Sequence, residues 1–200
     1  MDVPDCVTHY YLADRRPFLN LSDVDGDAVF DVMHDLNALR REGLHKRTFG
    51  RTYIQWRRLT EARLRAGFIA AGGQPERTAP HYFCLGESSW FAGLADNMLS
   101  LSLPVGALPL EQSSFTLVDS FSAMGLGPQF GFPAATEPHH KVVYPLSQLR
   151  DVVRRHGLPA ATSNDYGGFE RRLVDTYVEV QVWTDEPVRQ FLSDDVSISP

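Results

Sequence analysis

A glutamate within a strongly alternating segment is the most promising chemical group in this sequence. Residues 177–183 read Tyr-Val-Glu-Val-Gln-Val-Trp, which predicts a β-strand whose successive side chains point to opposite faces. Valines would occupy one face. The other face would carry Glu179 and Gln181 between the aromatic residues Tyr177 and Trp183, an arrangement typical of a cleft wall. The alternative is a glutamate on the solvated face of an antiparallel sheet.

Other polar and aromatic candidates are dispersed along the chain. They include His9, Arg57, Arg58, Tyr82 and Ser88. Each has a purely structural alternative. The histidine could be a hydrogen-bonded core residue, the arginines could be surface charges of an amphipathic helix, and the serine could cap a short helix.

Motifs for metal binding and for familiar nucleophiles are absent from the sequence. The seven histidines and two cysteines form no H-E-x-x-H, H-x₃₋₅-H or C-x-x-C pattern, so we expect no metal. There is no G-x-S-x-G elbow, and Cys84 lies within a predicted strand, where a cysteine usually acts as an inert hydrophobic residue. The missing G-x-G-x-x-G and Walker motifs argue against a doubly wound dinucleotide fold and against a phosphate-loop enzyme.

The net charge of −6 conceals a strongly basic segment. Residues 40–65 contain nine arginines and lysines against two glutamates, a local charge of +7 that leaves −13 for the rest of the chain. Such a segment can attract phosphate groups. The alternative is a solvated helix face.

The predicted elements indicate an α+β fold in a single domain, residues 1–200, with N-terminal helices and a mainly antiparallel mixed sheet. Helices are expected over 22–43, 52–71 and 146–156, and strands over 7–12, 81–85, 99–105, 114–118, 142–144 and 177–183. Residues 125–140 are rich in glycine and proline, which predicts a loop or lid. No membrane span or export signal is apparent, and both cysteines are expected to be free thiols, so we expect a cytoplasmic protein.

In their order along the chain, the candidate segments resemble ADP-ribosyltransferases, and most of all the DarT-type toxins that modify nucleic-acid bases. The resemblance rests on six short segments. Residues 8–10 contain His9, 55–59 contain the two adjacent arginines, 80–83 form the Tyr-Phe strand and 87–90 its serine turn. Residues 115–119 form a Phe-Thr…Asp segment, and 171–182 lead into the last strand. The last two segments have longer spacers than the family pattern. The helix expected over 22–43 has no counterpart in it.

The resemblance implies an ADP-ribosyltransferase-like fold and NAD as a substrate, with no metal. It places the catalytic function on Glu179 with Arg57 or Arg58. Glu179 would stabilise the oxocarbenium-like ribose that forms when the nicotinamide–ribose bond breaks. NAD would be bound by five residues: His9, Tyr10, Tyr82, Phe83 and Ser89. This hypothesis requires His9, Glu179 and a helix arginine to line one cleft rather than opposite faces of the sheet.

A nucleic-acid acceptor would suit the basic segment, with Trp56 available for base stacking on a single strand. A toxin-like enzyme of this kind would also need an inhibitory partner protein. Three other hypotheses remain open from the sequence. They are a non-enzymatic nucleic-acid or nucleotide-binding protein using residues 40–65, an NAD-independent ribonuclease using His9 or His81, and a partner-binding protein whose aromatic residues form its core.

Overall fold

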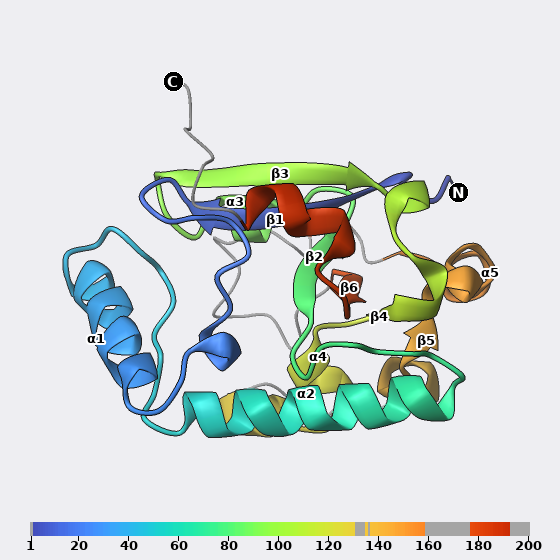
Figure 1. Cartoon of the computed structure of the whole chain (residues 1–200), viewed down its shortest axis with the longest axis horizontal. Helices are drawn as coiled ribbons and strands as arrows, with labels where there is room; N and C mark the ends of the chain where they lie inside the picture. Colours follow the sequence, from blue (N-terminus) through green and yellow to red (C-terminus); the bar gives the residue numbers. More distant parts are fainter. Residues whose placement is uncertain (1, 131–134, 136, 159–176, 193–200) are drawn as a thin grey trace.

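The computed structural model describes residues 2–130, 135, 137–158 and 177–192, and it shows an α+β protein built on one open sheet (Figure 1). Within these residues, all of the paired strands are antiparallel, in the order β3-β1-β2-β6-β4-β5. The sheet predicted to be mixed is therefore antiparallel where it is described. Its strands are β1 (Cys6–Leu12), β2 (His81–Leu85), β3 (Met98–Pro104), β4 (Ser113–Thr116), β5 (Tyr144–Pro145) and β6 (Glu179–Val182).

The helices lie around the sheet, with α1 at one end of the molecule, α5 at the opposite end and α2 along its lower side in Figure 1. Their bounds are α1 (Ala28–Arg41), α2 (Tyr53–Ala70), α3 (Ser89–Ala92), α4 (Ser120–Ala123) and α5 (Leu149–His156). The predicted start of the first helix at Ser22 was wrong. Residues Leu21–Asp23 form a separate 3₁₀ turn, capped by the side chain of Asn20 at the Ser22 amide.

Both faces of β6 are covered. Val178, Val180 and Val182 join a core cluster that includes α5, as the alternation predicted. On the opposite face, Trp183 packs against Leu64 and Phe68 of α2. The solvated-face alternative for this strand is therefore wrong.

The strands β1 and β2 diverge soon after they meet. The only ladder pair between these two described strands is Thr8 with Cys84, although β1 pairs with β3 along its whole length. Figure 1 shows β2 leaving β1 at a steep angle. Pairing between these two strands is therefore confined to one end of β1.

No helix among the described residues is long and apolar enough to cross a membrane. The predicted loop over 125–140 falls partly outside the described residues, at 131–134 and 136. Its described parts include two 3₁₀ helices, Gly127–Phe130 and Pro138–Lys141.

Candidate functional site

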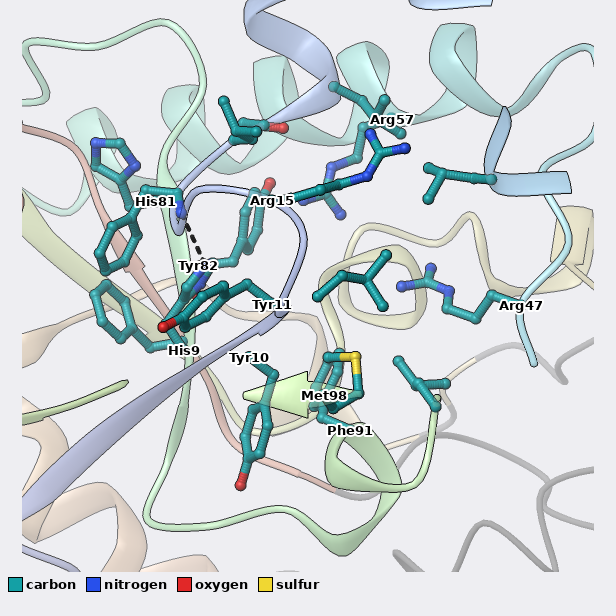
Figure 2. Close-up of a pocket in the computed structure, with 18 of the residues that line it drawn as sticks. His9, Tyr10, Tyr11, Arg15, Arg47, Arg57, His81, Tyr82, Phe91 and Met98 are labelled. Carbon is teal, nitrogen blue, oxygen red and sulfur yellow. Dashed lines mark hydrogen bonds between the residues drawn. The ribbon is translucent and has the colours of Figure 1, made fainter. Parts of the chain in front are cut away.

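A cavity of about 930 Å³ opens beside the divergent strands (Figure 2). It is bordered by β1, β2, β3 and β6, by α1, α2, α3 and α4, and by the segments 15–24 and 45–49. Of the residues that the resemblance assigned to the site, six line this cavity: His9, Tyr10, Arg57, Tyr82, Phe83 and Glu179. Arg58 and Ser89 are not among its lining residues.

Glu179 lies in the cavity wall with only 5 % of its surface exposed. One carboxylate oxygen, Oε2, accepts hydrogen bonds from the Tyr177 hydroxyl at 3.1 Å and from the Ser120 amide at 3.4 Å. The other, Oε1, accepts from Gln181 Nε2 at 3.2 Å. Burial raises the pKa of Glu179, Arg57 opposes this rise, and Asp119 adds to it. A buried carboxyl group with a perturbed pKa in a cavity is a common feature of active sites.

A buried polar chain, made of side chains that are hydrogen-bonded to one another, supports this carboxylate. Gln181, which is fully buried, donates to Glu179 and to Thr116 Oγ1, and its carbonyl oxygen accepts from the Ser114 hydroxyl at 2.8 Å. Trp183 Nε1 donates to the same Ser114 oxygen at 2.9 Å. The polar face predicted for β6 is therefore a connected network whose last member, Glu179, reaches the cavity.

Arg57 projects from α2 into the cavity and is held in place by two neighbours. Its Nε donates to Glu61 Oε1 at 2.9 Å, and its guanidinium carbon lies 3.8 Å from the centre of the Tyr82 ring. Burial alone would lower the pKa of Arg57, but Tyr82, Tyr53, Glu61 and Glu179 together raise it, so the guanidinium stays charged. Neither Nη atom bonds to a residue that the structure describes, which leaves both available to a ligand.

The adjacent Arg58 has a different environment. Its Nη2 donates to the carbonyl oxygen of Val24 at 3.0 Å on the exposed side of α2. Arg63 and Arg65 likewise donate to main-chain carbonyl groups, including those of Met124 and Pro75. Much of the basic segment therefore ties α2 to neighbouring loops.

His9 contacts the cavity, but both of its ring nitrogens are engaged with the main chain. Nδ1 lies 2.9 Å from the carbonyl oxygen of Tyr82, and Nε2 accepts the Phe18 amide hydrogen at 3.0 Å. This pair of partners requires the neutral ring with its proton on Nδ1. Burial is the main reason that the pKa of His9 falls to about 4, while the hydrogen bond to Tyr82 opposes the fall.

The register places His9 and Glu179 on opposite faces of the sheet. Thr8 pairs with Cys84 and Cys84 pairs with Glu179, so those three share a face and the next residue, His9, takes the other. Both nevertheless line the same cavity. The expected shared cleft is present, but the expectation that the two side chains would not lie on opposite faces of the sheet was wrong.

Aromatic rings cover much of the remaining wall. Phe91 stacks on Tyr10 at a centroid distance of 5.8 Å, and Trp90 stacks on Tyr177 at 5.8 Å. The Tyr10 hydroxyl accepts the Ser88 amide hydrogen at 2.9 Å. Ser88 itself caps α3, as its structural alternative predicted, and Ser89 is the first residue of that helix.

The cavity is basic although the chain is acidic. Six arginines and lysines line it against three carboxylates. Two of the arginines, Arg15 and Arg47, and the supporting Glu61 were not predicted as site residues. Arg47 lies in the basic segment 40–65 that the sequence analysis identified. For Glu61, the signal was its spacing of four residues after Arg57, since such pairs meet on a helix surface.

Among the described residues, no three histidine, cysteine, aspartate or glutamate side chains form a candidate metal site. No protein-family model matches the sequence, and no curated protein or solved structure matches this chain.

Proposed function

We propose that this protein transfers ADP-ribose from NAD to an acceptor, with Glu179 as the catalytic carboxylate. The observation that supports this function most strongly is the burial of Glu179 in the wall of a large basic cavity that Arg57 also lines. Burying a carboxylate costs free energy, so a buried carboxylate that borders a cavity favours a functional role. A basic cavity with aromatic walls suits a ligand that combines phosphates with planar rings.

In the proposed reaction, the bond between the nicotinamide nitrogen and ribose C1′ breaks, and its electron pair leaves with nicotinamide. The ribose becomes oxocarbenium-like, as in glycoside hydrolysis. The ionised Glu179 stabilises this positive charge, and it remains oriented by Tyr177 and Gln181. The acceptor then bonds to C1′, and the proton that it loses passes to the carboxylate or to water.

Arg57 would bind a phosphate of NAD through its two Nη atoms, since its Nε is occupied by Glu61. Arginine is well suited to this contact because its planar group can bind two phosphate oxygens at once. Tyr10, Tyr82 and Phe83 would contribute to the NAD site through their position on the cavity wall. His9 would contact the ligand directly only if its hydrogen bond to the Phe18 amide opened.

A nucleic acid remains the proposed acceptor. The basic residues that would contact it are Arg41 and Arg51, which are exposed and lie outside the cavity lining. Arg58, Arg63 and Arg65 are instead bonded to main-chain carbonyl groups. Trp56 is not among the cavity-lining residues, so base stacking there would occur outside the cavity. An inhibitory partner would act by covering the cavity entrance.

Incubation with NAD labelled in its adenylate half, together with DNA, RNA and protein acceptors, tests the proposal. Transfer of label to an acceptor is the expected result, and it should be absent with the Glu179→Gln variant. Strand scission without labelling would instead indicate a ribonuclease. Unchanged NAD in every mixture would refute the proposed transfer.

A second candidate is a non-enzymatic nucleotide-binding protein, which is favoured by the excess of basic residues in the cavity. It predicts binding of NAD or ADP-ribose without consumption. It also predicts that Glu179→Gln binds these ligands at least as well as the wild type, because a negative charge is removed.

A further inference from the structure

Two arginines from separate loops accompany Arg57 in the cavity. Arg15 follows β1, and Arg47 lies in the connection between α1 and α2. Figure 2 shows the side chains of Arg15, Arg47 and Arg57 extending into the same space from different segments. Neither Arg15 nor Arg47 makes an ion pair with a carboxylate in the part of the chain that the structure describes.

Arg15 has a polar side-chain atom that calls for a hydrogen-bond partner. Its Nε is buried and has no hydrogen-bond partner among the described residues. Buried polar atoms of this kind are rare in folded proteins, and each one calls for an explanation such as a bound ligand or water. The loop that carries Arg15 is fixed by the Arg15 amide bonding to Leu12 and by the Phe18 amide bonding to His9.

Arg47 is positioned by aromatic rings instead of by carboxylates. Its guanidinium carbon lies 5.5 Å from the ring centre of Phe49, 5.8 Å from that of Trp90 and 6.0 Å from that of Tyr53. Its backbone amide donates to His45 Nδ1 at 3.1 Å. Cation–π contacts hold a guanidinium while leaving its N–H groups available for an anion.

We propose that Arg15 and Arg47, together with Arg57, form a binding site for the diphosphate group of a dinucleotide. Arg15 and Arg47, which have no acidic partner among the described residues, and the outer edge of Arg57 are together suited to more than one phosphate group. The charge balance of the cavity, six basic residues against three acidic ones, fits the two negative charges of a diphosphate. The identity of the dinucleotide as NAD rests on the proposed function, but the recognition of a diphosphate does not.

His45 supports the same assignment. Burial is the largest cause of its lowered pKa, and the positive charges of Arg47, Arg40 and Arg15 lower it further. All three arginines line the same cavity as His45, and their positive charges act on it. A bound anion would relieve their mutual repulsion.

Titration calorimetry with inorganic pyrophosphate, ADP-ribose and adenosine monophosphate tests this site. The wild type should bind ADP-ribose more tightly than the monophosphate. Arg15→Gln and Arg47→Gln should each weaken ADP-ribose binding about 10-fold or more, the loss of roughly one charge-assisted contact. Arg47→Lys should bind with an intermediate affinity, because lysine keeps the charge but loses the planar fork.

Arg41→Gln is the matched control, since Arg41 ends α1 on the exposed surface and is not among the cavity-lining residues. It should change the affinity less than about 2-fold, in line with a screened surface charge. Circular dichroism spectra and thermal unfolding of every variant show whether a loss of binding reflects a loss of folding. Folded Arg15→Gln and Arg47→Gln variants with wild-type affinity would overturn the assignment, and so would a wild type that binds neither pyrophosphate nor ADP-ribose.

The outcome for this site is separable from the outcome for catalysis. Binding that depends on Arg15 and Arg47, without any NAD consumption, would support the diphosphate site and refute the proposed transfer. NAD consumption with unchanged ADP-ribose affinity in both variants would support the transfer and refute the site.

Discussion

Glu61 and Arg57 lie one helical turn apart on α2, and Glu61 Oε1 accepts the Arg57 Nε hydrogen at 2.9 Å. The same oxygen accepts a hydrogen bond from the Tyr82 hydroxyl at 3.2 Å. Glu61 is 2 % exposed and does not line the cavity. It is therefore a positioning residue, which fixes one edge of the guanidinium and directs the other into the cavity.

The Glu61→Gln substitution tests this role. It keeps the size of the side chain but replaces a charged acceptor with a neutral one, so Arg57 should lose its fixed orientation. We expect ADP-ribose binding to weaken about 10-fold, the scale of losing a supporting contact behind a ligand-binding group. Glu42→Gln, at an exposed position just after α1, is the control. Equal affinities for both variants would show that Glu61 does not position Arg57 for the ligand.

The raised pKa of Glu179 predicts a pH dependence of stability. The folded pKa lies above the ordinary value of 4.5, so the folded protein holds this proton more tightly than the unfolded chain does. The resulting stabilisation is present below pH 4.5 and is lost as the pH rises through the folded pKa. The loss amounts to about 1.4 kcal/mol for every tenfold difference in proton affinity between the folded and unfolded chains. Glu179→Gln removes this loss.

Urea unfolding of the wild type and of Glu179→Gln at pH 4.5 and pH 8 measures the effect. The variant should gain free energy of unfolding relative to the wild type as the pH rises. The catalytic rate of the wild type should also increase with pH as Glu179 ionises. A constant difference in stability between the two proteins at both pH values would contradict the raised pKa.

The lowered pKa of His9 predicts a pH dependence of stability with the opposite sign. Its folded pKa of about 4 lies below the ordinary value of 6.5, so the unfolded chain binds the proton more tightly. The resulting contribution to the free energy of unfolding is fully present above pH 6.5 and is lost as the pH falls towards 4. From the difference between the two pKa values, the full contribution is about 3 kcal/mol. Between pH 7 and pH 4.5, the wild type should lose more free energy of unfolding than His9→Gln, as measured by urea titration. Parallel losses would mean that His9 is not held neutral by its two main-chain partners.

Gln181 lies at the centre of the buried polar chain, so removing its hydrogen bonds should destabilise the fold. Gln181→Leu removes the donor to Glu179 and Thr116 and the acceptor for the Ser114 hydroxyl. Leaving buried polar groups unpaired costs roughly 1–3 kcal/mol, so the free energy of unfolding should fall by about that amount. Gln55→Leu, at an exposed position of α2, should change it by no more than about 0.5 kcal/mol. A Gln181→Leu protein as stable as the Gln55→Leu control would show that the buried polar chain does not stabilise the fold.

The sequence predicted the α+β class and most of the elements because hydrophobic periodicity is a local property. The alternation of 177–183 gave the correct division of β6 into a valine face and a polar face. It could not predict that α2 covers the polar face, since that depends on packing between distant segments. The helix start at Ser22 failed because Asn20 caps a short turn there.

The choice between Arg57 and Arg58 shows the same limit within the site. Consecutive helix residues point about 100° apart, so only one of the two can face the sheet, and the placement of α2 decides which. The bonding of His9 was equally inaccessible from the sequence, because its partners, Tyr82 and Phe18, are main-chain groups whose position depends on the divergence of β1 from β2.

The rate of nicotinamide release from NAD by the wild type, Glu179→Gln and Glu87→Gln tests the central claim most directly. Glu87 is exposed, lies outside the cavity lining and provides the same change of charge. We expect Glu179→Gln to lower the rate about 100-fold or more, the scale of losing one preorganised electrostatic contact to a transition state. Glu87→Gln should retain the wild-type rate. Full NAD turnover by a folded Glu179→Gln protein would contradict the assignment of Glu179 as the catalytic carboxylate.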